Sequence, residues 1–426
     1  MILFYVEKVS ERLLYTLDFI FSDRKIEYKI TNDLLSFKAF TGIKCNYSSV
    51  EVSSVYQLTP ASLLFDDDIR KYNLGRSSVG ETECLIFDGI TDPVASVFYI
   101  LSRMEEYINL KRDKHERFCA KDSILYQNDW LDKLMCERWS SNLITELEIF
   151  YNTNIERSEL PFSVIPTFDI DNAFAFKWKP LGRQILGEVR DRLQSNKALL
   201  QARKKVLRGE EKDPYDTYEY ILSIRKRGYE VYLFWLLGDY AKYDKNISSA
   251  DTRQAELIRD LNKTLKIGLH PSYKSNDAHY ILKKEKERLE LILKKEVNFS
   301  RQHFLKLSIP ETYQSLIKLG FKHDFTMGFA DEAGFRAGTL RPFKWFDLND
   351  NQVTDYMIHP FAYMDGTLLE YKNWSPAQSK EYIKKMLDEA RKFGGDFVCI
   401  WHNETIGGFG KWKGWEEILE YTLFHK

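Results

Sequence analysis

The stretch IPTFDID (residues 165–171) predicts a buried strand that ends in two acidic side chains. Asp169 and Asp171 stand two positions apart, and side chains alternate between the faces of a strand, so both carboxylates are expected on one face. Two like charges this close favour a function that needs them, such as a metal ion beside a general base. The alternative is a strand that ends in solvent.

From about residue 160 onward, short apolar segments alternate with segments of helical periodicity. The expected strands are SVIPTFD, VYLFWLL, TLKIGLH, KHDFTMG, DYMIHPF and DFVCIWH, at residues 163–169, 231–237, 264–270, 322–328, 355–361 and 396–402. Helices are expected between them, for example over 277–295 and 375–394. This alternation over 156–426 predicts a parallel α/β barrel or wound sheet. In a barrel, functional residues lie at the carboxyl ends of the strands.

Residues 1–155 show a different pattern and predict a separate, smaller α+β domain. Helical spacing is present over 9–23, 92–110 and 129–152, and strand-like segments include 27–31, 34–40 and 82–88. A charged group within residues 103–117 is open to three interpretations. The three interpretations are a functional site, a solvated face and an ion network between domains.

Composition narrows the class of protein. The 426 residues exceed one ordinary core, so two or more domains are expected. The 62 basic and 63 acidic residues give a formal charge of −1, which argues against a nucleic-acid partner. The five cysteines lack CxxC spacing and predict reduced thiols. The N-terminal segment carries charges that a signal peptide lacks, so we expect a cytoplasmic protein. The sequence predicts no oligomeric state.

Residues 177–208 form a basic insertion between two expected strands. They contain ten lysines and arginines against Glu188 and Asp191, with helical spacing. A solvated basic face is the more common role of such a segment. Peripheral contact with an anionic lipid surface, or with a phosphate-bearing substrate, is the alternative.

Ionisable side chains gather at the expected strand ends. They are Asp169, Asp171, His270, Arg301, His303, His359 and His402. Carboxylates and imidazoles can hold a divalent ion with an open position for water, and a neighbouring base can remove the proton of that water. A further histidine can protonate the leaving group. The set therefore predicts metal-dependent hydrolysis.

Four short motifs, TFDID, GLHPS, SRQH and VCIWH, occur in this order at the strand ends. They resemble the successive motifs of the polysaccharide deacetylase family, carbohydrate esterases that remove N- or O-acetyl groups from sugars. The resemblance covers about residues 160–426. It implies a deformed (β/α) barrel that binds a divalent metal ion. Zinc is the expected ion, and cobalt and nickel are the alternatives. Residues 1–155 resemble an uncharacterised module found in front of such domains and carry no function over.

The resemblance implies a role for each matching residue. Asp169 corresponds to the catalytic base, and Asp171, displaced by one inserted residue, corresponds to the metal-binding aspartate. His270 corresponds to a metal ligand. Arg301 corresponds to the arginine that pairs with the base, and His402 to the general acid that protonates the leaving amine.

The chain departs from the family pattern at two positions. The family pairs the first metal-binding histidine with a second one four residues later, where this chain has Lys274, and a protonated ammonium cannot bind a cation. His303 stands where the family has a proline. We expect His303 to replace the lost metal ligand. His279 is the other candidate, but its place at a helix start favours a surface or capping role.

Three further residues are expected on the substrate side. Residues 324–339 are loop-like and rich in glycine, and Asp324 and Arg336 are expected to shape a sugar groove together with nearby aromatic rings. Apolar residues before His402, including Trp401, are expected to hold the acetyl methyl group.

The expected function is removal of an acetyl group from a carbohydrate of envelope or surface glycan metabolism. An N-acetyl group is expected in preference to an O-acetyl group. A nucleotide- or lipid-linked sugar would suit a cytoplasmic enzyme. One alternative is an inactive carbohydrate-binding or scaffold protein, in which Lys274 marks a decayed metal site. Another is a metal-independent glycosidase, although Asp169 and Asp171 are too close in sequence to flank a glycosidic bond from opposite sides.

Overall fold

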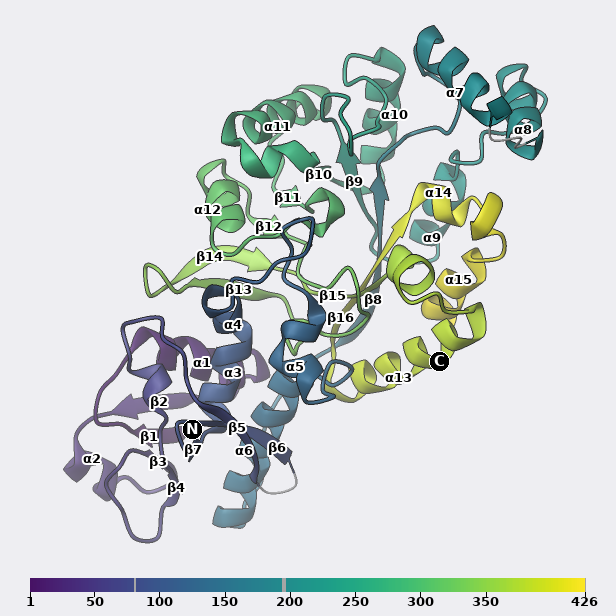
Figure 1. Cartoon of the computed structure of the whole chain (residues 1–426). Coiled ribbons are helices and arrows are strands. Elements are labelled where there is room, and N and C mark those ends of the chain that lie inside the picture. Colours follow the sequence, from purple (N-terminus) through teal and green to yellow (C-terminus); the bar gives the residue numbers. More distant parts are fainter. Residues whose placement is uncertain (80–81, 194–196, 426) are drawn as a thin grey trace.

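The chain folds into a small N-terminal domain and a larger curled sheet surrounded by helices (Figure 1). The computed structural model describes residues 1–79, 82–193 and 197–425. The predicted fold class, a deformed (β/α) barrel preceded by a smaller domain with both helices and strands, is confirmed.

The N-terminal domain begins with a parallel sheet in the order β2-β1-β3-β4. Its strands are β1 (Ile2–Tyr5), β2 (Tyr28–Thr31), β3 (Ile43–Tyr47) and β4 (Tyr56–Leu58), and its helices are α1 (Glu11–Phe21) and α2 (Leu34–Ala39). The strand expected over 34–40 is therefore wrong. The side chain of Asp33 accepts a hydrogen bond from the Leu35 N–H and caps a helix at this place.

A second, antiparallel sheet completes the N-terminal domain together with four helices. The elements are β5 (Leu74–Val79), β6 (Thr82–Phe87), β7 (Ile90–Thr91), α3 (Pro93–Leu101), α4 (Met104–Ile108), α5 (Ile124–Gln127) and α6 (Met135–Tyr151). The helix expected over 92–110 breaks at Arg103, whose φ of 56° is left-handed. The helix expected from residue 129 begins only at Met135.

The barrel sheet has nine strands in the order β13-β14-β12-β11-β10-β9-β8-β16-β15. They are β8 (Phe162–Ile170), β9 (Tyr232–Leu236), β10 (Lys266–His270), β11 (Phe299–Ser300), β12 (His323–Asp324), β13 (Phe343–Asp347), β14 (Gln352–Ile358), β15 (Phe361–Met364) and β16 (Gly395–His402). Within this sheet, the described strands β13 and β14 pair antiparallel, and the other described pairs are parallel. The edge strands β13 and β15 do not pair with each other in the described chain, so the barrel is open.

Helices surround this sheet. They are α7 (Leu181–Leu193), α8 (Lys197–Leu207), α9 (Tyr218–Lys226), α10 (Thr252–Asn262), α11 (His279–Leu293), α12 (Glu311–Lys318), α13 (Pro376–Phe393), α14 (Asn403–Ile406) and α15 (Glu416–Phe424). The sequence sets both ends of α13. Ser375 and Gln378 form a capping box before it, and Gly394 follows with a φ of 79° that favours glycine.

Two expected barrel strands differ from the sequence prediction. The segment 355–361 is divided between β14 and β15 at Pro360, which lacks the N–H that a continuous ladder needs. Strand β12 ends at Asp324, because Thr326 donates hydrogen bonds from its N–H and its hydroxyl to the Asp324 carboxylate and turns the chain.

A buried ion network joins the N-terminal domain to the barrel. Glu106 accepts hydrogen bonds from Arg103 Nε at 2.8 Å and, across the boundary, from Arg336 Nη2 at 2.6 Å. Glu137 of α6 likewise accepts one from Arg341 Nε at 2.9 Å. The apolar core is also continuous through both parts. Of the three interpretations of the charged group, the ion network between domains is the one that the structure shows for Arg103 and Glu106.

Two further findings concern the cysteines and the helices. The five cysteines are free thiols. Within residues 1–79, 82–193 and 197–425, no helix combines the length and apolarity that crossing a bilayer requires.

Candidate active site

Strand register brings the predicted site residues to one end of the barrel. In the parallel pair of β8 and β16, His402 lies opposite Asp169. In the pair of β10 and β11, Leu269 lies opposite Ser300, so the next residues, His270 and Arg301, are also neighbours. Parallel strands end at the same edge of a sheet, which is why residues far apart in the sequence meet here.

Three of these side chains form a compact cluster. One ligand atom from each of Asp171, His270 and His303 lies within 4.8 Å of the others. The Nε2 atom of His270 is 3.3 Å from Asp171 Oδ1, and that of His303 is 3.4 Å from Asp171 Oδ2. The structure places His303, and neither Lys274 nor His279, in this cluster of the described residues.

Hydrogen bonds on the far side of each imidazole orient the cluster. His270 Nδ1 donates to the carbonyl oxygen of Arg301 at 2.6 Å, and His303 Nδ1 lies 2.9 Å from Asp244 Oδ1. A carbonyl oxygen can only accept, so Nδ1 of His270 carries the hydrogen and its Nε2 is available as a ligand. Such outer partners fix the orientation of metal-binding histidines.

The third member of the cluster depends on an unusual turn. Phe304 and Leu305 follow His303 with φ values of 59° and 52°, a left-handed conformation that side chains disfavour. The N-terminal domain supports this turn, because Arg117 Nη1 donates to the Phe304 carbonyl oxygen at 2.9 Å. Arg117 Nη2 also donates to the hydroxyl of Tyr371 at 3.2 Å. A residue of the N-terminal domain therefore helps to build the site wall.

The cluster fits a divalent metal ion. Two imidazole nitrogens and a carboxylate are a usual donor set for zinc, and Asp171 Oδ1 is a buried oxygen without a hydrogen-bond partner among the described residues. Burial opposes ionisation of Asp171, but His303 and His270 outweigh it and hold its pKa well below the usual range. Burial also lowers the pKa of His303, yet Asp171 and Asp244 raise it to about 9. An ion would replace the proton on His303.

Asp169 stands beside the cluster and is held by Arg301. The Nη1 atom of Arg301 donates to Asp169 Oδ1 at 2.9 Å and to the Thr167 hydroxyl at 2.7 Å. The other oxygen, Asp169 Oδ2, lies 3.8 Å from His270 Nε2 and so faces the cluster. Both Asp169 and Arg301 are buried, and the guanidinium lies over the ring of Phe234. This arrangement fixes one carboxylate oxygen and leaves the other for chemistry.

His402 stands across the cavity and pairs with Asp365. His402 Nδ1 lies 2.9 Å from Asp365 Oδ1, and the Thr405 hydroxyl also donates to this carboxylate. Burial lowers the pKa of His402, but the Asp365 carboxylate raises it well above its usual value. The Asp365 carboxylate therefore favours the protonated form of His402, whose Nδ1 lies on Asp365 and whose ring borders the cavity.

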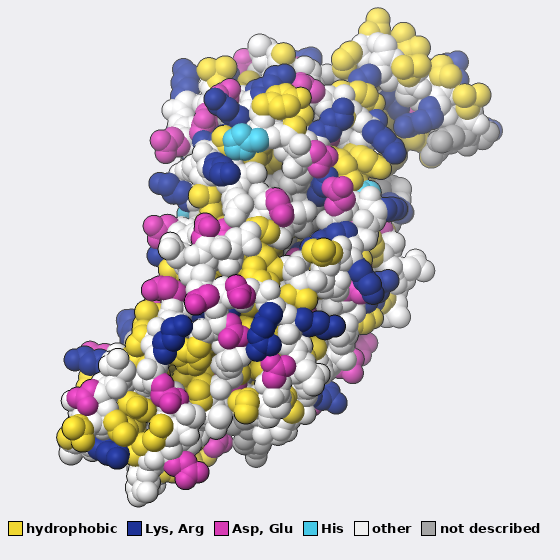
Figure 2. Space-filling model, turned by 60° about the vertical axis from the view of Figure 1, so that its left-hand side comes forward, with side chains coloured by type: hydrophobic (Ala, Val, Ile, Leu, Met, Phe, Trp, Pro, Cys, Tyr) yellow, Lys and Arg dark blue, Asp and Glu magenta, His cyan; other side chains and the backbone are white. Residues whose placement is uncertain are grey.

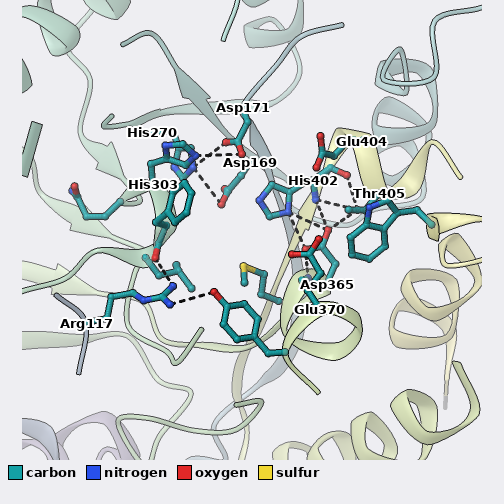
Figure 3. A pocket seen from close by; sticks show the side chains of 17 residues that line it. Arg117, Asp169, Asp171, His270, His303, Asp365, Glu370, His402, Glu404 and Thr405 are labelled. Atoms are coloured by element: carbon teal, nitrogen blue, oxygen red, sulfur yellow. Dashed lines mark hydrogen bonds and ion pairs between the residues drawn. The ribbon is translucent and has the colours of Figure 1, made fainter. Parts of the chain in front are cut away.

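These groups line a cavity of about 170 Å³. Figure 3 shows Asp169, Asp171, His270 and His303 on one side, with His402, Asp365, Glu404 and Thr405 across from them. Arg117, Phe304, Tyr371 and Trp412 are among the residues of the remaining wall. The cavity thus has a candidate metal cluster and base on one side and the imidazole of His402 on the other.

Three predicted substrate residues are not among the described residues that line this cavity. The carboxylate of Asp324 is buried and accepts from Thr326. Arg336 is engaged by Glu106 in the network between the domains. Trp401 is fully buried, and its Nε1 donates to the Tyr363 hydroxyl at 3.3 Å. The structure therefore corrects their placement in a sugar groove, because packing and ion pairing direct all three into the interior.

Four residues at or beside the site were not among the predicted catalytic, metal-binding or substrate residues. Asp365 directly follows β15, so the strand-end rule that selected the histidines could have found it. Glu404, which follows His402 by two residues, is open to the same argument. Arg117 belongs to the charged group within residues 103–117, for which a functional site was one interpretation, and it reaches the cavity wall. Asp244 lies in a loop without a recognisable pattern, and a tertiary contact brings it to the ring of His303.

Comparisons with known proteins address the two parts separately. Residues 2–152 match DUF7033, a family of unknown function. No curated protein matches the chain. Among solved structures, a protein from Mycobacterium smegmatis proposed to be a polysaccharide deacetylase aligns at 16% identity and a TM-score of 0.38, covering 62% of this chain and 87% of that one.

Two further solved structures show a comparable likeness. One is a proposed polysaccharide deacetylase of O-antigen biosynthesis from Bordetella bronchiseptica, at 16% identity, a TM-score of 0.34 and coverage of 62% and 81%. The other is an allantoinase, at 12% identity, a TM-score of 0.38 and coverage of 62% and 83%. Scores of this size assign no activity to this chain, and the neighbours differ in the activities that their names state.

Proposed function

We propose that the protein is a metal-dependent hydrolase that removes an acetyl group, most readily an N-acetyl group, from a carbohydrate. One observation carries the proposal. The cluster of Asp171, His270 and His303 shares one cavity wall with Asp169, which Arg301 holds from behind, and His402 faces them. The order of the four sequence motifs, each at a strand end, supports the same function.

Asp171, His270 and His303 would hold the ion, which when bound supplies a Lewis acid for the acetamide carbonyl and for water. Asp169 Oδ2, which faces the cluster, would accept the proton of the attacking water, while Arg301 holds Oδ1. As the C–O bond forms and the C–N bond breaks, His402 gives its proton to the departing nitrogen. The products are acetate and the free amine of the sugar.

An inactive carbohydrate-binding protein remains the alternative, and metal content separates the two. We expect protein purified without chelator to contain about one divalent ion per chain, and His270→Ala and His303→Ala to lose it. Asp244→Asn should weaken binding by about 10–100-fold, because it releases the ring of His303. Elemental analysis and titration with zinc, cobalt and nickel give the measurement.

Lys274→Ala is the matched control for that series. Lys274 is exposed and lies outside the described cavity lining, so its removal should leave metal content unchanged. A wild-type protein that is free of metal and gains no thermal stability from any of the three ions would refute the proposal. Loss of metal in His270→Ala but not in His303→Ala would refute only the assignment of the third ligand.

Removal of the Asp365 charge should change the pH dependence of hydrolysis. His402 acts as an acid, so the rate falls as pH rises through its pKa, which Asp365 raises. Asp365→Asn should lower that pKa and move the alkaline limb of the kcat/KM profile toward lower pH. Thr405→Val, which removes a neutral hydroxyl from the same carboxylate, should leave the limb in place. An unmoved limb in Asp365→Asn would show that His402 is not the acid.

A further inference from the structure

The basic insertion forms a helical hairpin of α7 and α8 that projects from the barrel (Figure 1). Hydrogen bonds and a ring contact of Arg183 hold the end of the hairpin that lies next to the barrel. Arg183 donates hydrogen bonds to the carbonyl oxygens of Lys245 and Asn246 and lies over the ring of Tyr240. These contacts hold α7 in a defined direction.

The two helices meet through charged side chains. The carboxylate of Asp191 is fully buried and accepts from Arg203 Nε at 2.9 Å and from Nη2 at 2.6 Å. The guanidinium of Arg203 also lies 4.8 Å from the ring centre of Phe176. The polar side of α7 therefore faces α8, and its apolar side faces away.

That apolar side has no partner among the described residues. Its members are Leu181, Ile185, Leu186, Val189 and Leu193, with exposed fractions of 72%, 53%, 70%, 45% and 81%. At 100° per residue these five positions fall within an arc of about 140°, so they form one stripe along the helix. A soluble surface helix normally turns such a stripe toward the core, which makes this orientation informative.

The exposed basic side chains of the hairpin are called its basic border here, and they are Arg190, Arg192, Lys204, Lys205 and Arg208. Each of them forms an ion pair with Glu188, Asp191, Glu210 or Glu211. Residues 177–208 nevertheless hold ten lysines and arginines against Glu188 and Asp191, so the hairpin carries a net positive charge. Figure 2 shows hydrophobic side chains over the projecting lobe with lysines and arginines beside them. An apolar stripe with a basic border is the pattern of a helix that lies in the interface of an anionic membrane.

The position of the hairpin adds to this argument. The chain enters α7 from the carboxyl end of β8, the strand that carries Asp169 and is followed by Asp171. Tyr240, an exposed aromatic residue between Arg183 and Lys245, lies at the base of the hairpin. A surface that contacts the stripe would therefore lie toward the cavity end of the barrel.

We propose that the α7–α8 hairpin docks the protein peripherally on an anionic lipid bilayer, with the stripe of α7 inserted among the headgroups. Burial of the five stripe residues among the lipids supplies the hydrophobic part of the binding free energy. The basic border favours negatively charged lipid. The more common role of a basic segment, a solvated face, does not account for five exposed apolar side chains. The proposal is independent of the hydrolase activity.

Sedimentation with vesicles tests the docking. We expect the full chain to bind vesicles of equal parts phosphatidylcholine and phosphatidylglycerol, to bind phosphatidylcholine alone weakly, and to lose binding as salt rises. The double variant Leu186→Asp/Leu193→Asp should reduce partitioning by at least about tenfold, because it removes two apolar side chains from the stripe. Both positions are exposed, so the fold should survive, and circular dichroism verifies this.

Leu291→Asp is the matched control, since Leu291 is 80% exposed on α11 and lies outside the stripe. It should bind as the wild type does. A wild-type protein that stays in solution, or a double variant that binds equally well, overturns the proposal. So does a dimer that the double variant dissociates without any vesicle binding, because a second copy would then be the partner of the stripe.

Discussion

The variant Asp169→Asn should lose hydrolysis by about 10²–10⁴-fold while it keeps its metal ion. Asp169 lies beside the cluster but is not one of its three members. The amide oxygen of asparagine can still accept the hydrogen bond from Arg301. It cannot take a proton from water, so the variant removes the base and little else. Release of acetate from N-acetylglucosamine, chito-oligosaccharides or para-nitrophenyl acetate gives the rate.

Asp324→Asn is the matched control for this variant. Asp324 is also a buried aspartate at a strand end, but it lies outside the described lining of the cavity. It should keep kcat and KM within a few-fold of the wild type. An Asp169→Asn protein with bound metal and an undiminished rate would exclude Asp169 as the base. A raised KM in Asp324→Asn would restore a role in substrate binding to that residue.

The variant Glu106→Ala should destabilise the protein by about 3–5 kcal/mol. Glu106 and both of its partners, Arg103 and Arg336, are buried. Burial raises the pKa of Glu106, but Arg336 and Arg103 lower it below the usual value, so the carboxylate is ionised in the folded protein. Removal of the carboxylate leaves two cations close together without this shared partner. Urea denaturation followed by tryptophan fluorescence measures the change.

Asp388→Ala provides the comparison for that measurement. Asp388 pairs with Lys384 on the exposed face of α13, where water and salt screen the interaction, so the unfolding midpoint should not move measurably. A midpoint for Glu106→Ala that equals the wild-type value would refute the predicted contribution of this network to stability.

Local pattern predicted several of the barrel strands, whereas β11 and β13 match none of the expected segments. Residues 163–169, 264–270 and 396–402 are apolar runs that end in ionisable side chains, and β8, β10 and β16 form there as expected. Parallel strands share an edge, so the rule that places function at that edge brings Asp169, His270 and His402 together. The predicted boundaries were less accurate where the backbone conformation of one residue ends an element. Pro360 separates β14 from β15, and the left-handed Arg103 separates α3 from α4.

The prediction that three residues line a sugar groove was incorrect for a different reason. Asp324, Arg336 and Trp401 have side chains that a sugar site could use, and nothing in their local sequence shows that other residues engage them. Arg336 meets Glu106, which is 230 positions earlier in the chain. Composition and spacing cannot reveal a partner at that separation.

The sequence by itself determined the fold class, the edge of the sheet where the chemistry lies, and the identity of the residues at the strand ends. These follow from hydrophobic periodicity and from the direction of parallel strands, both of which are local properties. Only the tertiary structure decided that His303 joins Asp171 and His270, with Asp244 and Arg117 supporting that place, and that the apolar side of α7 faces away from the body. Those outcomes depend on contacts between segments that are distant in the chain.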